Sequence, residues 1–305
     1  MNFSTSAAIF RWKPAAWLRV SGADAASFLQ GQFTNELRNV VAGGCVYGLW
    51  LTLKGKVVAD SFIVRASEGA GSAEAAGPVF WIGSYFSTAA VIRERLDGFI
   101  IADDVLIEDF TETDRAVSIL GDGVQDLRKT DAMSGVLFPG RRERQGNVEW
   151  IYPATSTGDV ERALAGLREL SGDEIERRRI EAGIAAVPTD IGGGDLPGEG
   201  ALEDMAISYT KGCYLGQEVM ARLKSMGQVR RRLLRVASAK GGAPVALPAD
   251  LFNGDRKVGE LRSTVDDGAG GWLGLALLSL IHAGPGASFS LSPNGATTVR
   301  LVGTP

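Results

Sequence analysis

The sequence predicts an α+β fold that ends in a small antiparallel β-barrel. Helical and strand-like segments are mixed along the first three quarters of the chain, whereas the remainder contains only short apolar strands separated by turns. With 305 residues the chain is also too long for one ordinary core. We therefore expect one α+β region over residues 1–229 and a β-barrel over residues 230–305.

The first region is expected to begin with a strand and a short helix. The strand covers residues 17–20, and the helix stops near Gly31. Ser21 is followed three residues later by Asp24, which is the spacing of a helix-capping pair. The sequence thus predicts a helix that opens just after Ser21.

A β-hairpin is expected next. Two β-rich runs, residues 47–53 and 57–64, flank a Lys-Gly-Lys turn. Asp60 lies inside the second run. Periodicity leaves two positions open for its side chain, the polar face of the strand or a cavity.

Mixed elements continue up to the barrel. They are strands at residues 79–82, 116–120 and 148–152, and helices at residues 87–96, around 124–127, at 159–170 and at 175–183. Ser171 and Glu174 form a capping box ahead of the last helix. Residues 185–200 are rich in Pro and Gly and predict an irregular loop.

The barrel is predicted from six short strands punctuated by turn signals such as Asn294-Gly295. The strands are expected at residues 233–237, 245–247, 258–262, 272–280, 288–291 and 298–302.

Composition narrows the functional classes. The chain carries a net charge of −4, and 45% of its residues are hydrophobic, with no apolar run long enough to span a bilayer. We expect a soluble cytoplasmic protein, monomeric, with no membrane association and no stable nucleic-acid complex. The basic run Arg230-Arg231-Arg232 leaves an RNA contact open as a weaker idea.

Cysteine and histidine usage argues against a metal site. Cys45 and Cys213 are far apart and match no metal-binding, redox or disulfide pattern. His282 is the only histidine, which excludes sites that need paired imidazoles. We therefore expect no metal centre.

One segment concentrates reactive side chains between glycines. It reads Lys211, Gly212, Cys213, Tyr214, Leu215, Gly216, Gln217, Glu218. If a helix starts after Gly216, the helix N-terminus favours a thiolate at Cys213, and Lys211 and Arg222 would act in the same direction. The alternatives are a buried apolar Cys213, a solvated Lys211, a core Tyr214 and a simple Glu218–Arg222 helix pair.

This segment resembles the signature of the YgfZ group of folate-binding proteins, relatives of the T-protein (aminomethyltransferase) of the glycine cleavage system. Residues 219–222, 226–227 and 230–232 continue the match. So do residues 20–35, 54–60, 179–184 and 196–199.

The resemblance implies a ring of three subdomains around a central channel that holds tetrahydrofolate. Residues 1–229 would form two subdomains, and the barrel would be the third. Asp60 and Glu181 would face the folate, because a carboxylate can accept both N–H groups of a pterin edge. Glu199 and Arg222 would be further cofactor-binding residues. The T-protein has two aspartates where this chain has Ala59-Asp60.

The function implied by the resemblance is that of a tetrahydrofolate-binding accessory protein. It would help to assemble or maintain iron–sulfur clusters in cluster-dependent enzymes, including tRNA-modifying ones, with those enzymes or cluster-assembly proteins as partners. Cys213 would be the reactive or ligating thiol, with Asp60 as a second catalytic residue. The alternative is a tetrahydrofolate-dependent aminomethyltransferase or demethylase.

Overall fold

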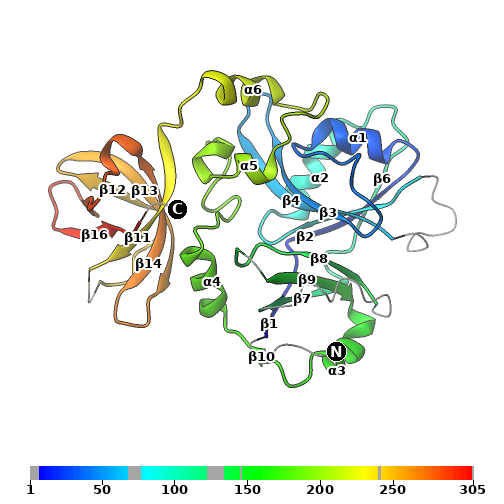
Figure 1. Cartoon of the computed structure of the whole chain (residues 1–305), viewed down its shortest axis with the longest axis horizontal. Helices are drawn as coiled ribbons and strands as arrows, with labels where there is room; N and C mark the ends of the chain where they lie inside the picture. Colours follow the sequence, from blue (N-terminus) through cyan, green and yellow to red (C-terminus); the bar gives the residue numbers. More distant parts are fainter. Residues whose placement is uncertain (1–6, 68–76, 122–133, 145, 240–241, 304–305) are drawn as a thin grey trace.

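Two five-stranded sheets and a closed barrel surround a central segment of the chain (Figure 1). The computed structural model describes residues 7–67, 77–121, 134–144, 146–239 and 242–303. The expected helical piece around residues 124–127 lies outside these residues. The mixed α+β fold with a C-terminal barrel is confirmed.

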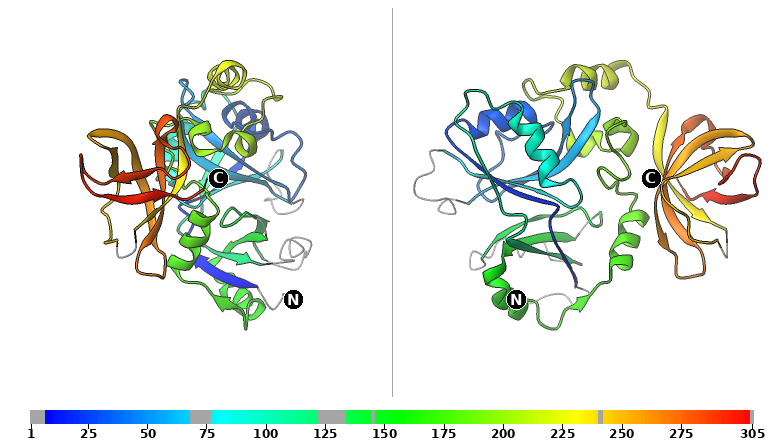
Figure 2. Two further views of the ribbon diagram at one scale, coloured as in Figure 1. Left: turned by 60° about the vertical axis from the view of Figure 1, so that its left-hand side comes forward. Right: turned by 180° about the vertical axis from the view of Figure 1, so that it is seen from behind.

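The first sheet has the strand order β3-β4-β5-β2-β6. Its strands are β2 (Ala16–Ser21), β3 (Cys45–Leu51), β4 (Val57–Arg65), β5 (Phe80–Ser84) and β6 (Leu106–Asp109). Helices α1 (Ala25–Gln32) and α2 (Ala89–Asp97) cover its outer face, where Leu29 and Ile92 pack on Leu18 and Ile82 (Figure 2, right). The predicted cap at Ser21 is wrong, because Ser21 still belongs to β2 and Asp24 occupies the N-cap.

The second sheet has the order β10-β1-β7-β9-β8. Its strands are β1 (Ala8–Trp12), β7 (Asp114–Leu120), β8 (Val136–Pro139), β9 (Asn147–Pro153) and β10 (Arg168–Glu169). The helix expected over residues 159–170 is instead α3 (Thr157–Ala163). Gly166 has φ +85°, which breaks the helix, and β10 then pairs parallel to β1.

The barrel closes in the order β11-β14-β13-β12-β15-β16. Its strands are β11 (Arg231–Ser238), β12 (Ala249–Asn253), β13 (Arg256–Asp266), β14 (Trp272–Ser279), β15 (Ser288–Ser290) and β16 (Thr297–Leu301). The strand expected at residues 245–247 is wrong. Pro244 and Pro248 flank that stretch and lack the N–H groups of a central ladder, so the strand starts at Ala249.

The central segment connects these three bodies. It contains α4 (Gly172–Glu181), the 3₁₀ turn η3 (Pro197–Gly200), α5 (Glu203–Ala206) and α6 (Gln217–Met226). The capping box of Ser171 and Glu174 is present at α4, as predicted. One hydrophobic cluster includes Trp17, Phe138, Val187 and Leu277, so both sheets, the central segment and the barrel share a core.

A buried ion pair fixes α4 and the central segment against the barrel. Arg179 of α4 is 3% exposed, and its Nη1 lies 2.5 Å from Oδ2 of the fully buried Asp190. Ser263 of β13 donates to the other oxygen of Asp190 at 2.5 Å and accepts from Arg179 at 3.0 Å. Three separate segments therefore meet at one carboxylate.

Removing that carboxylate should destabilise the protein strongly. Asp190→Ala leaves a buried guanidinium with reduced compensation, so we expect the free energy of unfolding in urea to fall by about 3 kcal/mol. The control is Asp159→Ala, whose partner Arg162 and own side chain are 76% and 72% exposed. That change should cost at most about 1 kcal/mol. Equal losses in the two variants would contradict this view of the network.

Candidate functional site

The 211–218 segment is a loop that leads into α6. The loop is tied to α1, because Leu215 N–H donates to the carbonyl of Gly31 at 3.3 Å. Gly216 is the N-cap of α6 and has φ +87°. A Cβ on Gly216 would lie 2.8 Å from the carbonyl oxygen of Thr52, so both its dihedral and its packing require glycine.

Lys211 binds backbone carbonyls. Its Nζ donates to the carbonyl oxygens of Gln30 and Phe33 at 2.7 Å and of Asn35 at 2.8 Å. Burial lowers the pKa of Lys211 to about 8, and the Glu36 carboxylate opposes this shift. All three ammonium N–H groups of Lys211 therefore anchor the loop, and its support of a thiolate at Cys213 stays a prediction.

Cys213 is exposed. The first helical residue, Gln217, lies four positions further on, and the side chain of Gln217 donates back to the carbonyl of Lys211 at 3.3 Å. Glu218 and Arg222 form an exposed i,i+4 pair with 3.5 Å between Oε1 and Nη2. The thiol is thus accessible at the surface, while the residues around it hold the loop in place.

Asp60 belongs to a buried polar cluster. It is 3% exposed and accepts hydrogen bonds from Tyr47 at 2.9 Å and from Ser84 and Ser87 at 2.8 Å each. A carboxylate has about four lone-pair sites, so the described residues leave a single site on Oδ2. Of the two positions left open for Asp60, the structure selects the interior.

A second cluster of the same kind follows. The fully buried Glu149 accepts from Tyr85 at 2.6 Å and also from Trp12, Ser118 and Asn147. Arg142 lies over the ring of Tyr85, with 3.9 Å from its Cζ to the ring centroid. In the first cluster, Arg141 lies over Tyr47 at the same distance. Burial raises the pKa of Tyr47 and of Tyr85, so both hydroxyls remain protonated donors.

Glu181 is the last residue of α4. Its side chain is exposed, and its carbonyl oxygen accepts a hydrogen bond from Nη1 of Arg235 in β11 at 2.8 Å. Glu181 therefore lies beside the barrel, whereas Asp60 lies within the first sheet.

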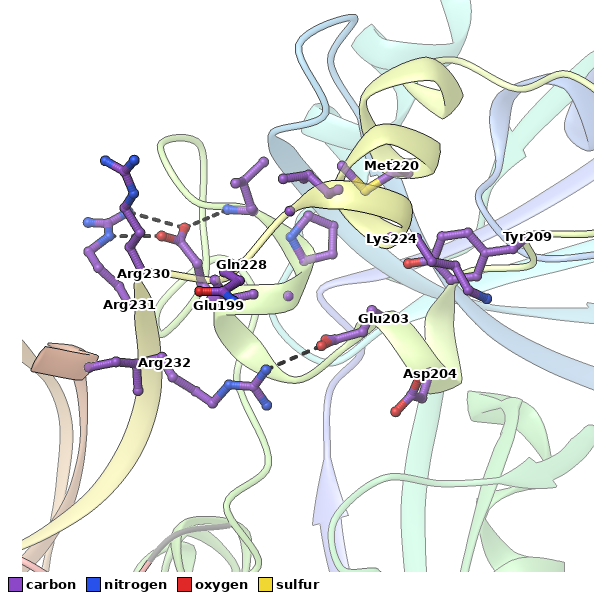
Figure 3. A pocket seen from close by; sticks show the side chains of 17 residues that line it. Glu199, Glu203, Asp204, Tyr209, Met220, Lys224, Gln228, Arg230, Arg231 and Arg232 are labelled. Carbon is purple, nitrogen blue, oxygen red and sulfur yellow. Dashed lines mark hydrogen bonds and ion pairs between the residues drawn. The ribbon is translucent and has the colours of Figure 1, made fainter. Parts of the chain in front are cut away.

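A cavity of about 930 Å³ lies between α6, the η3–α5 segment and the start of β11 (Figure 3). Its apolar lining comes from Leu196, Pro197, Met220, Leu223, Val229 and Leu280, and its polar lining includes Glu199, Glu203, Tyr209, Lys224 and residues 230–232. Of the sequence-predicted site residues, Glu199 lines this cavity; Asp60, Glu181 and Cys213 are not part of its lining.

Two of the three consecutive arginines in the cavity wall are already paired. Arg231 donates to Glu199 at 2.8 Å and also contacts Asp195 at 3.2 Å. Arg232 lies 3.4 Å from Glu203 (Figure 3). These pairs account for two of the cations on which the idea of an RNA contact rested.

The cavity wall also contains Glu203, Tyr209 and Lys224, which were not predicted from the sequence. Nζ of Lys224 lies 3.7 Å from the centroid of the Tyr209 ring. The position of Lys224 on the helix that follows the signature segment is a sequence signal that could have identified it. Its neighbours on α5 and β11 could not be identified in this way, because only the fold brings these elements together. Within the described ranges, no group of three or more His, Cys, Asp or Glu residues is placed to hold a metal ion. None of the helices in the described part is long and apolar enough to cross a membrane.

The buried Lys211 ammonium predicts a pH dependence. The unfolded chain keeps this proton up to about pH 10.5, whereas the native protein releases it from about pH 8. Between these values the unfolded state binds more protons, so the contribution of Lys211 to the free energy of unfolding rises with pH.

We expect the free energy of unfolding of the wild type, relative to that of Lys211→Gln, to increase across this interval in urea titrations. Subtracting the variant removes the titration of all other groups. A difference that stays constant with pH would contradict the lowered pKa.

Comparison with known proteins supports the resemblance. No family model matches the chain. The chain is 30% identical over 246 residues to "Iron-sulfur cluster assembly factor IBA57, mitochondrial" from Homo sapiens. The matched residues cover 75% of this chain and 66% of the human protein, just under two thirds of its length. It is 25% identical over 259 residues to "tRNA-modifying protein YgfZ" from Klebsiella pneumoniae, which covers 82% of this chain and 79% of that protein.

The fold agrees with a solved structure of the T-protein. Aminomethyltransferase T of the glycine cleavage system from Bartonella henselae superposes with a TM-score of 0.77 over 97% of this chain and 84% of that chain, at 15% identity. That identity speaks for the fold alone, and the T-protein-like fold is thereby confirmed. The chain is therefore a homologue of the IBA57 and YgfZ proteins, built on the fold of aminomethyltransferase T.

Proposed function

We propose that this protein is an accessory factor that helps to assemble or maintain iron–sulfur clusters in other enzymes, including enzymes that modify tRNA. The observation that carries the proposal is the exposed Cys213 in the signature segment of a chain whose homologues are named for cluster assembly and tRNA modification. The three hydrogen bonds of Lys211 support it, because they fix the loop that presents this thiol.

The chemistry of a single thiol limits what Cys213 does. Common iron–sulfur clusters need four cysteine ligands, and Cys45, the other cysteine, lies within β3. Cys213 therefore acts as a transient ligand or nucleophile, and the remaining ligands come from the client enzyme or from a cluster-assembly protein.

We further propose tetrahydrofolate as the small-molecule ligand. In this proposal Glu181 accepts N–H groups of the pterin through its exposed carboxylate, and Asp60 accepts one more through the vacant site on Oδ2. Glu199 and Arg222 would contact the ligand further along α6 and η3. The T-protein fold supports this ligand, and so does a cavity within the size range of small-molecule sites, which Glu199 lines between α6, η3 and β11.

Replacement of Cys213 tests the cluster role. In a bacterial strain that lacks its own copy of the protein, Cys213→Ala and Cys213→Ser should fail to restore the activity of cluster-dependent enzymes, because neither side chain supplies a thiolate. The matched control, Cys45→Ala, removes the other thiol and should restore activity. Full restoration by both Cys213 variants would rule out the thiol role.

A titration with folate tests the ligand. The wild type should bind 5-formyltetrahydrofolate, and Glu181→Gln and Asp60→Asn should each weaken binding about tenfold, since each loses a charged hydrogen-bond acceptor. Glu94→Gln, on the exposed face of α2, serves as the control. Unchanged affinity in both variants would remove these residues from the site. Formation of methylenetetrahydrofolate from an aminomethyl donor would favour the transferase alternative.

A further inference from the structure

A separate cavity of about 470 Å³ lies where the chain passes from the first sheet to the second. Strand β6 of the first sheet ends at Asp109, and β7 of the second begins at Asp114 (Figure 1). The link between them lines this junction cavity, together with the start of β8 and the end of β9. It shares no described lining residue with the cavity beside α6, and Asp60, Glu181 and Cys213 are not part of its wall.

The wall of the junction cavity is mostly aromatic and aliphatic. Its members are Trp17, Trp81, Phe110, Val136, Ile151, Pro153 and Ala154, with Thr113, Asp114, Gly135 and Thr155 beside them. The ring of Trp81 stacks on that of Trp17 with 4.8 Å between the centroids, and Phe110 meets Trp81 edge-on at 5.3 Å. Such a wall suits a flat apolar body.

Among the described residues of this wall, only Asp114 carries a charge. It is 6% exposed, and the hydroxyl of Thr113 donates to its Oδ1 at 3.1 Å. Burial raises the pKa of Asp114, and hydrogen bonding by Thr113 and Trp17 and the charge of Arg115 oppose this shift. Within the described residues no lysine or arginine forms an ion pair with Asp114, so its negative charge is poorly compensated.

The two other acids buried between the sheets differ from Asp114 in this respect. Asp60 and Glu149 each accept from a tyrosine, and Arg141 and Arg142 cover those two tyrosine rings. Each of these acids therefore has a cation close by. A ligand that brings a positive charge would supply what Asp114 lacks.

One cation approaches the junction cavity from its rim and is already paired. Cζ of Arg19 lies 5.9 Å from the centroid of the Phe110 ring, and its Nη2 lies 2.7 Å from Oε2 of Glu108. Arg19 therefore compensates Glu108 and leaves Asp114 to a ligand.

We propose that the junction cavity binds a small organic cation, an amine carried on a flat aromatic ring, with the ammonium group at the carboxylate of Asp114 and the ring against Trp81 and Phe110. The volume of about 470 Å³ lies in the range of small-molecule sites. The ammonium gains a charge-assisted hydrogen bond, and aromatic faces attract the same charge. A lysine side chain of a partner protein would bring the charge without a ring and would leave the aromatic wall uncovered.

The test measures binding of three indoles of similar size to the full chain by calorimetric titration. Tryptamine is a cation, tryptophol is neutral and indole-3-propionate is an anion. Tryptamine should bind about tenfold more tightly than tryptophol, because its charge meets a buried carboxylate, and indole-3-propionate should bind most weakly. Equal affinities for tryptamine and tryptophol, or no binding of any of the three, would overturn the proposal.

Variants locate the ligand. Asp114→Asn should bind tryptamine about tenfold more weakly and tryptophol as tightly as the wild type, since only the charge is lost. The matched control is Asp103→Asn, at an exposed position before β6, which should keep the wild-type affinities. Ala154→Trp fills the cavity from an exposed position of its wall, so it should block both ligands while the core stays unchanged. Wild-type binding of tryptamine by both Asp114→Asn and Ala154→Trp would place the ligand elsewhere and refute the site.

A last comparison separates a small molecule from a side chain of a partner protein. Nα-acetyl-lysine methylamide carries the same ammonium group on an aliphatic stem. It should bind more weakly than tryptamine, because it covers less of the aromatic wall. Tighter binding of the lysine compound would assign the junction cavity to a protein side chain and contradict the proposal.

Discussion

Pairing between acids of the central segment and arginines around it determines how the barrel meets the rest of the molecule. Asp190 binds Arg179, Asp195 binds Arg262 of β13, and Glu199 binds Arg231 of β11. These carboxylates are buried and so depend on their partners for compensation. The irregular central segment is thereby held at fixed points, and the cavity between η3 and β11 takes its shape from them.

In the signature segment, some residues fix the conformation of the loop and one residue, Cys213, is exposed on it. Lys211 and Gly216 fix the backbone of the loop. Lys211 donates hydrogen bonds to three backbone carbonyls, and Gly216 has a positive φ that other residues rarely adopt. Cys213 remains exposed between them. On a loop that is already anchored, Cys213 meets a partner at a smaller entropic cost of ordering on binding, as the proposed transient role requires.

The buried carboxylates Asp60 and Glu149, one in each sheet, have the same arrangement of neighbours. Asp60 and Glu149 each accept from a tyrosine, and an arginine covers each tyrosine ring. Each carboxyl group thereby has several hydrogen-bond donors inside a largely apolar region. The retained acid in β4 therefore has a structural role in addition to the ligand role proposed for it.

The sequence by itself determined the fold class, the barrel, the hairpin around Asp60 and the helix capped by Ser171 and Glu174, because periodicity, turn residues and caps act over a few neighbouring positions. It also marked Cys213 through the signature segment. Only the tertiary structure decided that Lys211 anchors α1 and that Arg230 and Lys224 share a cavity. Those contacts join residues that are distant along the chain or lie on separate elements, and their partners depend on burial and packing, which local patterns do not encode.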